Sequence, residues 1–238
     1  MSILDQISFL RKSMYPYDII FSLNHKDKLI VDVNTPFESL SCYCNIPIFL
    51  FYRGTKYLLS QWFLQDELES LKDLLAKAIK NELQLHESLI SLGYLYNILL
   101  ECEHTSRLKD KDDNDETCSG LVYDGDDLWM QWVGFKYLLY HNGDVTAWIY
   151  NDSTGNIKLE IAPRYSGFDD ESQAISKDGY NVWMKSYKTI LVTTIPTETA
   201  QHWIQQASEI LSFIDKKVNT PSDIANDGTL IYEDCSRR

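Results

Sequence analysis

The chain has 238 residues, with 35 acidic against 22 basic side chains and a formal net charge of −13. This balance argues against a protein that binds nucleic acid through a basic face or anionic lipid through a basic patch. Hydrophobic residues make up 44% and charged residues 24%, a composition that excludes a disordered chain and supports a sizeable core.

The first part of the chain predicts two β-hairpins, preceded by a short amphipathic helix at Ser2–Met14. Tyr17–Leu23 and Lys28–Val33 are rich in β-branched and aromatic residues and flank a polar turn. Ile46–Arg53 and Lys56–Trp62 have the same character and flank a Gly-Thr turn. We therefore expect four strands here, joined in pairs.

Between Leu64 and about Leu100 the apolar residues change to helical spacing. They recur every three or four positions, and only a histidine interrupts them: Leu64, Leu68, Leu71, Leu75, Ile79, Leu83, His86 and Ile90. One straight helix over this range would be about 55 Å long at 1.5 Å per residue. We therefore predict a break near Ser91–Gly93 that makes two helices.

A strongly acidic segment follows the predicted helix. Ten acidic residues and three basic ones lie between Glu101 and Asp127, so the local net charge is −7 (acids at 101, 103, 110, 112, 113, 115, 116, 124, 126 and 127; bases at 107, 109 and 111). Such a block is most simply a solvated loop or linker. Alternatively it is a docking surface for a basic protein, because a field of this kind raises association rates.

The second part of the chain is dense in aromatic residues and again strand-like. Strands are predicted at Trp129–Tyr140 (with a helix as the less favoured alternative), Val145–Tyr150, Asn156–Ala162 and Tyr187–Ile195, with a long gap at Pro163–Asn181. A gap of that length is typical of a lid or a binding loop. A closing helix begins at Pro196, and a short strand is predicted at Thr229–Tyr232.

These elements predict an α+β fold. A mostly antiparallel sheet is built from hairpins, with the long broken helix and the C-terminal helix packed on one face, since strands are joined by short turns. The predicted organisation is 1–101 for the hairpins and long helix, 102–127 for the acidic linker or loop and 128–238 for the aromatic strands and last helix. A single continuous domain is the alternative.

No local signature of catalysis or of a bound cofactor occurs in the sequence. Phosphate-binding glycine loops, the nucleophile elbow, kinase motifs and the HExxH metal motif are all missing. The acidic run does not have the glycine and glutamate of a calcium loop. Cys42 and Cys44, like Cys102 and His104, are separated by one residue, whereas structural zinc sites favour two to four. We expect no metal, no cofactor and no catalytic residue.

The odd number of cysteines, five, and a start without an apolar signal region favour a cytoplasmic protein with reduced thiols. No apolar run approaches the length of a membrane span. We therefore expect no membrane partner. The sequence leaves the oligomeric state undetermined.

The candidate binding residues are acids that attract a basic partner and aromatic or arginine side chains that anchor interfaces: Asp110, Asp112, Asp113, Asp115, Glu116, Trp129, Trp132, Trp148, Arg164, Tyr165 and Trp183. The simpler interpretation of the tryptophans is that alternate members are core and the rest cover a sheet face. Trp148 alternates with Val145, Ala147 and Ile149, so we expect one aromatic sheet face.

The leading hypothesis is a non-catalytic acidic module that binds a basic protein, in its concrete form an immunity or antitoxin-type inhibitor of a basic toxin such as a nuclease. The first alternative is an enzyme or small-ligand-binding protein with a pocket near His141, Trp148, Arg164 and the 163–181 gap. The second is a self-assembling structural component with exposed edge strands.

Overall fold

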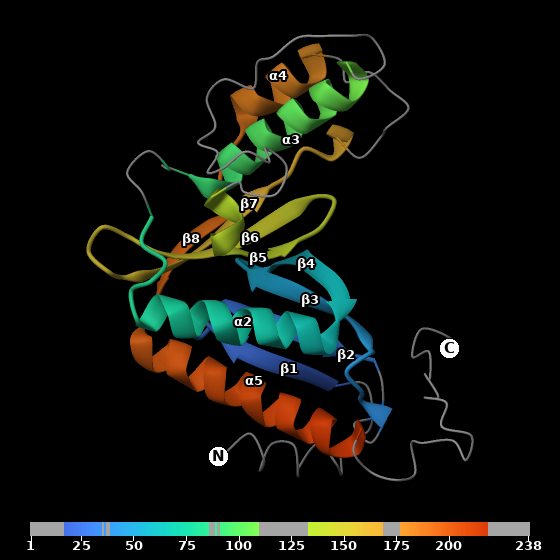
Figure 1. Cartoon of the computed structure of the whole chain (residues 1–238), viewed down its shortest axis with the longest axis vertical. Coiled ribbons are helices and arrows are strands. Elements are labelled where there is room, and N and C mark those ends of the chain that lie inside the picture. The colour runs from blue at the N-terminus through green and yellow to red at the C-terminus, as the bar shows by residue number, and fades with distance from the viewer. Residues whose placement is uncertain are drawn as a thin grey trace. The chain divides into compact units, whose positions relative to one another are not determined.

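The computed structural model describes residues 17–34, 36, 39–85, 89, 91–109, 133–168 and 177–218 (Figure 1). Contacts divide the chain into two compact units: unit 1 comprises Met1–Lys80 together with Ile195–Arg238, and unit 2 comprises Asn81–Thr194. The predicted helix at Ser2–Met14 and the predicted strand at Thr229–Tyr232 lie outside the described residues.

Unit 1 contains a four-stranded antiparallel sheet in the order β1-β2-β3-β4. Its strands are β1 (Tyr17–Ser22), β2 (Lys28–Val33), β3 (Asn45–Tyr52) and β4 (Thr55–Phe63). The four predicted strands and both hairpins are confirmed. In the first turn, Oδ1 of Asn24 accepts hydrogen bonds from the backbone N–H groups of Lys26 at 2.8 Å and Asp27 at 2.9 Å.

The second hairpin turn places Arg53 and Gly54 at positive φ, 50° and 82°. Two successive residues in the left-handed region are typical of the tight turns whose twist matches that of the flanking strands. The glycine adopts this conformation without a Cβ penalty.

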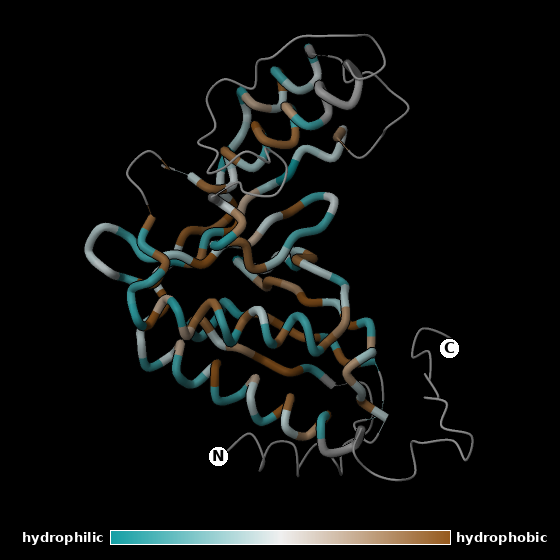
Figure 2. Tube along the Cα trace, viewed as in Figure 1, coloured by the Kyte–Doolittle hydropathy of each residue, from teal (hydrophilic) through white to brown (hydrophobic). Residues whose placement is uncertain are grey.

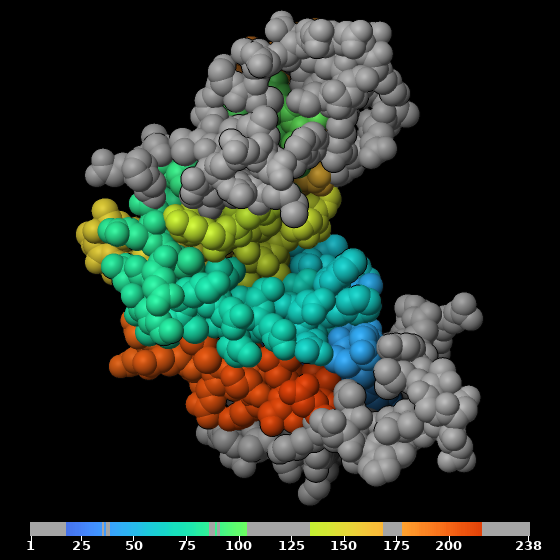
Figure 3. Space-filling model, viewed as in Figure 1, coloured from blue at the N-terminus to red at the C-terminus, as the bar shows by residue number. Residues whose placement is uncertain are grey.

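Two helices of unit 1 cover one face of this sheet. They are α2 (Leu64–Ile79) and α5 (Thr197–Val218), which pack against each other (Figures 1 and 3). Ser60 on β4 donates a hydrogen bond to Glu67 of α2, and Trp203 of α5 lies edge-on to Phe21 of β1, with ring centroids 5.7 Å apart. Phe21 pairs with Leu29 and Leu29 with Leu50, while Ile48, two residues before Leu50 on β3, pairs with Ser60. Phe21 and Ser60 therefore lie on the same face of the sheet, which is the face that the two helices cover.

The two helices are amphipathic, as their sequences predict, and hydrophobic and hydrophilic residues alternate along both in Figure 2. The buried stripe of α2 contains Leu64, Leu68, Leu71 and Leu75, and that of α5 contains Ala200, Trp203, Ala207, Ile210, Leu211 and Ile214. The predicted C-terminal helix is therefore confirmed, with its start at Thr197 directly after the proline.

The predicted long helix is broken, but earlier than the sequence suggested. Helix α2 ends at Ile79, and α3 runs from Leu92 to Lys109 in unit 2. Leu83, placed on the helical stripe by its spacing, is instead extended: its backbone oxygen accepts from Asn151 N–H at 2.8 Å, and Leu85 N–H donates to Asn151 O at 2.9 Å. Pairing with the end of a strand thus competes successfully with helical spacing. His86 and Ile90 lie outside the part of the chain that the structure describes.

Unit 2 contains a second four-stranded sheet, in the order β5-β6-β7-β8. Its elements are η2 (Val133–Tyr137), β5 (Leu138–His141), β6 (Val145–Asn151), β7 (Ile157–Pro163), η3 (Ser166–Phe168), α4 (Lys177–Ser186) and β8 (Leu191–Ile195), together with α3. The β5–β6 and β6–β7 pairs are antiparallel. The architecture is α+β, which confirms the predicted fold class.

Two predictions for unit 2 need correction. Within the predicted strand at Trp129–Tyr140, the described residues 133–137 form a turn of 3-10 helix, and the strand begins only at Leu138. The gap at Pro163–Asn181 contains η3 and the start of α4. Helix α3 continues to Lys109, and the rest of the segment 102–127 lies outside the described residues, so its role as a linker or loop stays a prediction.

Candidate protein-binding surface

Two of the predicted binding residues, Tyr165 and Trp183, come together in unit 2. Tyr165 lies between β7 and η3, and Trp183 lies on α4. Their ring centroids are 5.4 Å apart, and both side chains are half-buried. Tryptophan and tyrosine in this state retain accessible ring surface, which is the form in which they anchor protein interfaces.

These two rings belong to a larger group, which we name the α4 cluster: Tyr94, Tyr165, Phe168, Tyr180, Trp183 and Tyr187. Adjacent centroids are 5.1 to 6.1 Å apart. Tyr180 and Phe168 are buried at 4% and 6% exposure, whereas Tyr94 is 42% exposed. The cluster therefore has a packed inner side and an accessible rim.

Sequence reasoning missed four members of the α4 cluster, mainly because Pro163–Asn181 was interpreted as a loop and Tyr187 as the start of a strand. The spacing of Tyr180, Trp183 and Tyr187 at i, i+3 and i+7 is the signal of a helical aromatic face. Burial raises the pKa of Tyr187 to about 12, with Ser91 opposing and Glu160 reinforcing the shift. Its hydroxyl lies 3.4 Å from Ser91 Oγ and serves as a hydrogen-bonding group.

Arg164, also a predicted binding residue, connects the end of β7 to the β5–β6 turn. Its Nη1 donates to the carbonyl oxygens of Asn142 at 3.3 Å and Gly143 at 3.1 Å, and its backbone N–H donates to Asp144 O at 2.6 Å. Partial desolvation, reinforced by the Arg164 charge, lowers the pKa of His141. Arg164 and His141 are thus electrostatically coupled, with the imidazole biased towards its neutral form.

Trp148, the third member of the alternative pocket, is a core residue in this structure. Its side chain is 0% exposed, its Nε1 donates to Oγ1 of Thr146 at 3.0 Å, and its ring lies edge-on to Tyr96 at 5.5 Å. All seven residues of β6 are buried, so the expected aromatic face carrying Trp148 is not exposed. This outcome matches the simpler interpretation in which the tryptophan is core.

A buried carboxylate, Glu160 on β7, lies at the start of α3. Its Oε1 accepts from Ser91 Oγ at 2.9 Å and Gly93 N–H at 3.2 Å, and its Oε2 accepts from the Tyr150 hydroxyl at 3.2 Å. Burial raises the pKa of Glu160, and these hydrogen bonds oppose the rise. A carboxylate here also meets the positive end of the helix dipole. Its chemistry is therefore structural: it fixes the helix start on the sheet.

Two further contacts hold α3 against β7: the close approach of Gly93 to the strand and the hydrogen bonds of the Asn97 side-chain amide. Gly93 lies against Ala162 so tightly that a Cβ would collide with the alanine Cβ. One turn later, Nδ2 of Asn97 donates to Gly93 O at 2.8 Å and Pro163 O at 3.0 Å, while its Oδ1 accepts from Tyr165 N–H at 2.8 Å. The position of Tyr165 in the α4 cluster is thus set by α3.

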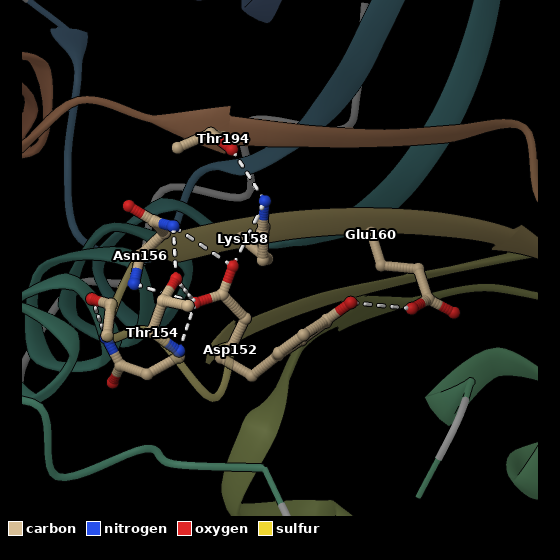
Figure 4. Close-up of polar contacts among 9 residues, drawn as sticks. Asp152, Thr154, Asn156, Lys158, Glu160 and Thr194 are labelled. Atoms are coloured by element: carbon tan, nitrogen blue, oxygen red, sulfur yellow. Dashed lines mark hydrogen bonds and ion pairs between the residues drawn. The ribbon is translucent and has the colours of Figure 1, made fainter.

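The β6–β7 hairpin carries an exposed polar network centred on Asp152 (Figure 4). Asp152 accepts from Thr154 and Asn156, and these bonds hold the pKa of its carboxyl well below the usual range. Lys158 pairs with Asp152 at 3.3 Å and donates to Thr194 Oγ1 at 2.8 Å. The network closes the turn and connects β7 to β8 through side chains of its own residues.

The remaining predicted binding residues lie outside the described residues: Asp110, Asp112, Asp113, Asp115, Glu116, Trp129 and Trp132. Among the described side chains, no three histidines, cysteines, aspartates or glutamates gather as a metal ion requires. No described helix is both long and apolar enough to cross a membrane.

Comparison with known proteins gives one weak likeness. No protein-family model matches the chain, and no curated protein does. Among solved structures, the chain is similar to a crystal structure of CdiI from Burkholderia dolosa AUO158, with a TM-score of 0.39 and 12% identity, over 82% of this chain and 99% of that one. A likeness at this level establishes neither a shared fold nor a shared activity.

Proposed function

We propose that this protein acts by binding a basic protein partner, without catalysis. The observation that carries the proposal is the concentration of negative charge. Unit 2 has 19 acidic and 9 basic residues, whereas the rest of the chain has 16 and 13. The segment from Glu101 to Asp127 accounts for most of this surplus. A local surplus of this size steers an oppositely charged protein towards one part of the surface.

The aromatic side chains of unit 2 support the proposal by offering short-range contacts. Helix α3 contains the start of the acidic segment, and its first turn carries Tyr94 at the rim of the α4 cluster. Trp183 and Tyr165 are half-buried in the same cluster. Electrostatic attraction speeds the association of two proteins, and aromatic anchors make the resulting interface specific.

The concrete form of the proposal is an immunity or antitoxin-type inhibitor. A nuclease or other nucleic-acid-binding toxin must present a basic surface to phosphates. An acidic protein that covers this surface excludes the nucleic acid directly, so inhibition needs no chemistry of its own. A partner of this kind fits the charge of unit 2 better than a neutral or acidic one.

The test is affinity capture with the full chain from a lysate of the organism that encodes it, at low and at high salt. We expect one basic protein to be held at low salt and released at high salt. The variant D110N/D112N/D113N/D115N/E116Q should lose this capture. If the captured protein is a nuclease, adding the wild-type chain should suppress its activity on DNA or RNA, and the neutralised variant should not.

A matched control separates the acidic segment from net charge in general. It neutralises five exposed acids elsewhere and so changes the net charge equally: Asp18, Asp73, Asp144, Asp178 and Glu198. Capture that survives in this control and fails in the first variant supports the proposal. Capture of nothing at either salt, or equal loss in both variants, contradicts it.

A further inference from the structure

An exposed aromatic patch lies in unit 1 and includes none of the predicted binding residues. It consists of Tyr43, Trp62 and Phe63, which are 47%, 56% and 38% exposed, and we call it the Trp62 patch. The Phe63 ring lies 6.3 Å from that of Tyr43 and 5.2 Å from that of Trp62. Isolated exposed aromatics are ordinary, but three that are connected through contacts with Phe63 form a surface that favours interaction.

The backbone holds the Trp62 patch in place. Trp62 and Phe63 are the last residues of β4, immediately before α2, where all of the final three strand residues are exposed. The turn carrying Tyr43 is fixed to the start of this helix, because Leu64 N–H donates to Cys44 O at 2.9 Å and Gln65 N–H donates to Cys42 O at 3.5 Å. A prearranged aromatic surface loses little conformational entropy on binding.

A carboxylate borders the patch. Nε1 of Trp62 donates to Oδ2 of Asp66 at 3.1 Å, so the indole is oriented by its one polar group while the residue stays 56% exposed. Asp66 is exposed and lies in the first turn of α2. An indole face next to a carboxylate offers two attractions to a cation: the ring quadrupole and the negative charge.

We infer that the Trp62 patch docks an arginine side chain of a basic partner, with the guanidinium stacked on Trp62 and hydrogen-bonded to Asp66. Arginine fits better than lysine because its planar group stacks on an aromatic ring and donates to a carboxylate at the same time. The inference deepens the proposed function, on which it rests for the basic character of the partner, and it adds a second contact surface in unit 1.

The inference predicts a preference for arginine over lysine at equal charge. The probes are fluorescently labelled octaarginine and octalysine, titrated with the full chain at one ionic strength and followed by fluorescence anisotropy. A cation–π contact at an exposed site corresponds to about a two- to fivefold difference in dissociation constant. We expect octaarginine to bind more tightly than octalysine by this factor.

Substitutions then locate the preference. Trp62→Ala should bring the arginine-to-lysine ratio to about one, Asp66→Asn should reduce it, and Trp62→Phe should retain part of it. Phe135→Ala, at an aromatic residue of unit 2 with 43% exposure, should leave the ratio unchanged. Circular dichroism of each variant verifies that it folds, as expected for changes at exposed side chains.

The variant with the neutralised acidic segment separates this inference from the proposed function. It should weaken both peptides alike and preserve their ratio. If both peptides bind that variant as they bind wild type, the charge basis of the proposed function fails, while the ratio still reports on Trp62. A wild-type ratio of one, a ratio that Trp62→Ala does not change, or no binding of either peptide would overturn the inference.

Discussion

Among the residues that the structure describes, units 1 and 2 each combine a four-stranded sheet with two α-helices, but they hold the helices by different means. In unit 1, α2 and α5 bury leucine, isoleucine and tryptophan side chains, and the described polar groups buried with them are few: Ser60, Glu67 and Gln206. In unit 2, α3 is fixed to β7 through Glu160, Asn97 and the close approach at Gly93. Apolar burial therefore determines how the helices of unit 1 pack, whereas hydrogen bonds and one close contact determine the position of α3 in unit 2.

The largest expected effect is in unit 1. Trp203 is 1% exposed, contacts Phe21 and donates to Ser22 O at 3.3 Å. Trp203→Ala should lower the free energy of unfolding of unit 1 by about 4 kcal/mol, because it removes a large buried side chain and leaves a cavity. Native-state hydrogen exchange, read peptide by peptide, measures this for each unit. The exposed neighbour His202→Ala should change it by less than about 0.5 kcal/mol.

The next effect concerns the close approach in unit 2. Gly93→Ala should cost about 3 kcal/mol, because the new Cβ collides with Ala162 and would lie 2.8 Å from the Tyr187 hydroxyl. The same exchange measurement should show the loss in α3 and β7. Gly54→Ala is the control: nothing lies within 4 Å of its Cβ, and only its φ of +82° opposes the change, at about 1 kcal/mol. Equal costs at the two glycines would contradict the packing argument.

Removing the carboxylate at the start of α3 should have a slightly smaller effect. Glu160→Ala leaves the hydroxyls of Ser91 and Tyr150 and the Gly93 N–H without their acceptor. Loss of a partner for buried donors should cost roughly 2 to 3 kcal/mol in unit 2. Glu160→Gln keeps a carbonyl oxygen and should recover part of this stability. If the glutamine variant is as unstable as the alanine variant, charge rather than hydrogen bonding holds the helix.

The last expected effect is a pH dependence in unit 1, which vanishes at low pH. Burial, opposed by the Ser60 hydrogen bond, raises the pKa of Glu67 from 4.5 to about 7. A carboxyl whose pKa is raised in the folded state contributes stability below its unfolded pKa and loses it as the pH rises through the folded value. Glu67→Gln should therefore be more stable than wild type by about 3 kcal/mol at pH 8 and nearly equal to it at pH 4.5.

Urea denaturation of both proteins across this pH range measures the difference. The amide oxygen introduced by Glu67→Gln still accepts a hydrogen bond from Ser60, so a loss of packing is not expected. A wild-type stability that stays level between pH 4.5 and pH 7 relative to the variant would show that Glu67 ionises normally in the folded state.

The structure of unit 1 is predicted from the sequence better than that of unit 2, because apolar burial leaves a local pattern and contacts between distant residues do not. The stripes of α2 and α5 and the alternation of the strands follow from apolar burial, which leaves a periodic pattern. The end of α2 cannot be predicted from this pattern, because Leu83 continues the apolar spacing while its backbone pairs with Asn151, 68 positions away. The Asn97 and Glu160 contacts depend on partners 66 to 69 positions distant, for which no local pattern exists.

The candidate surface was predicted in part. Tyr165 and Trp183 were selected for their residue types, and the structure brings them together because η3 and α4 turn towards α3. Trp148 was selected on the same grounds but is buried, since both faces of β6 are covered. The sequence predicts only that Trp62 ends a strand, because alternation does not reveal that residues 61–63, although still paired with β3, are all exposed.

The order in which the ribosome delivers the chain follows from the discontinuous make-up of unit 1. Its sheet and α2 are synthesised first, but α5, which covers the remaining apolar surface of α2, follows only after residues 81–194. At about 5 to 20 residues per second, this delay lasts roughly 6 to 20 s. Throughout that time the leucine stripe of α2 lacks its partner helix, and at its end unit 2, which is continuous in sequence, has all of its residues. The nascent chain therefore completes its inserted unit before its outer one and offers an apolar helix face to chaperones in the interval.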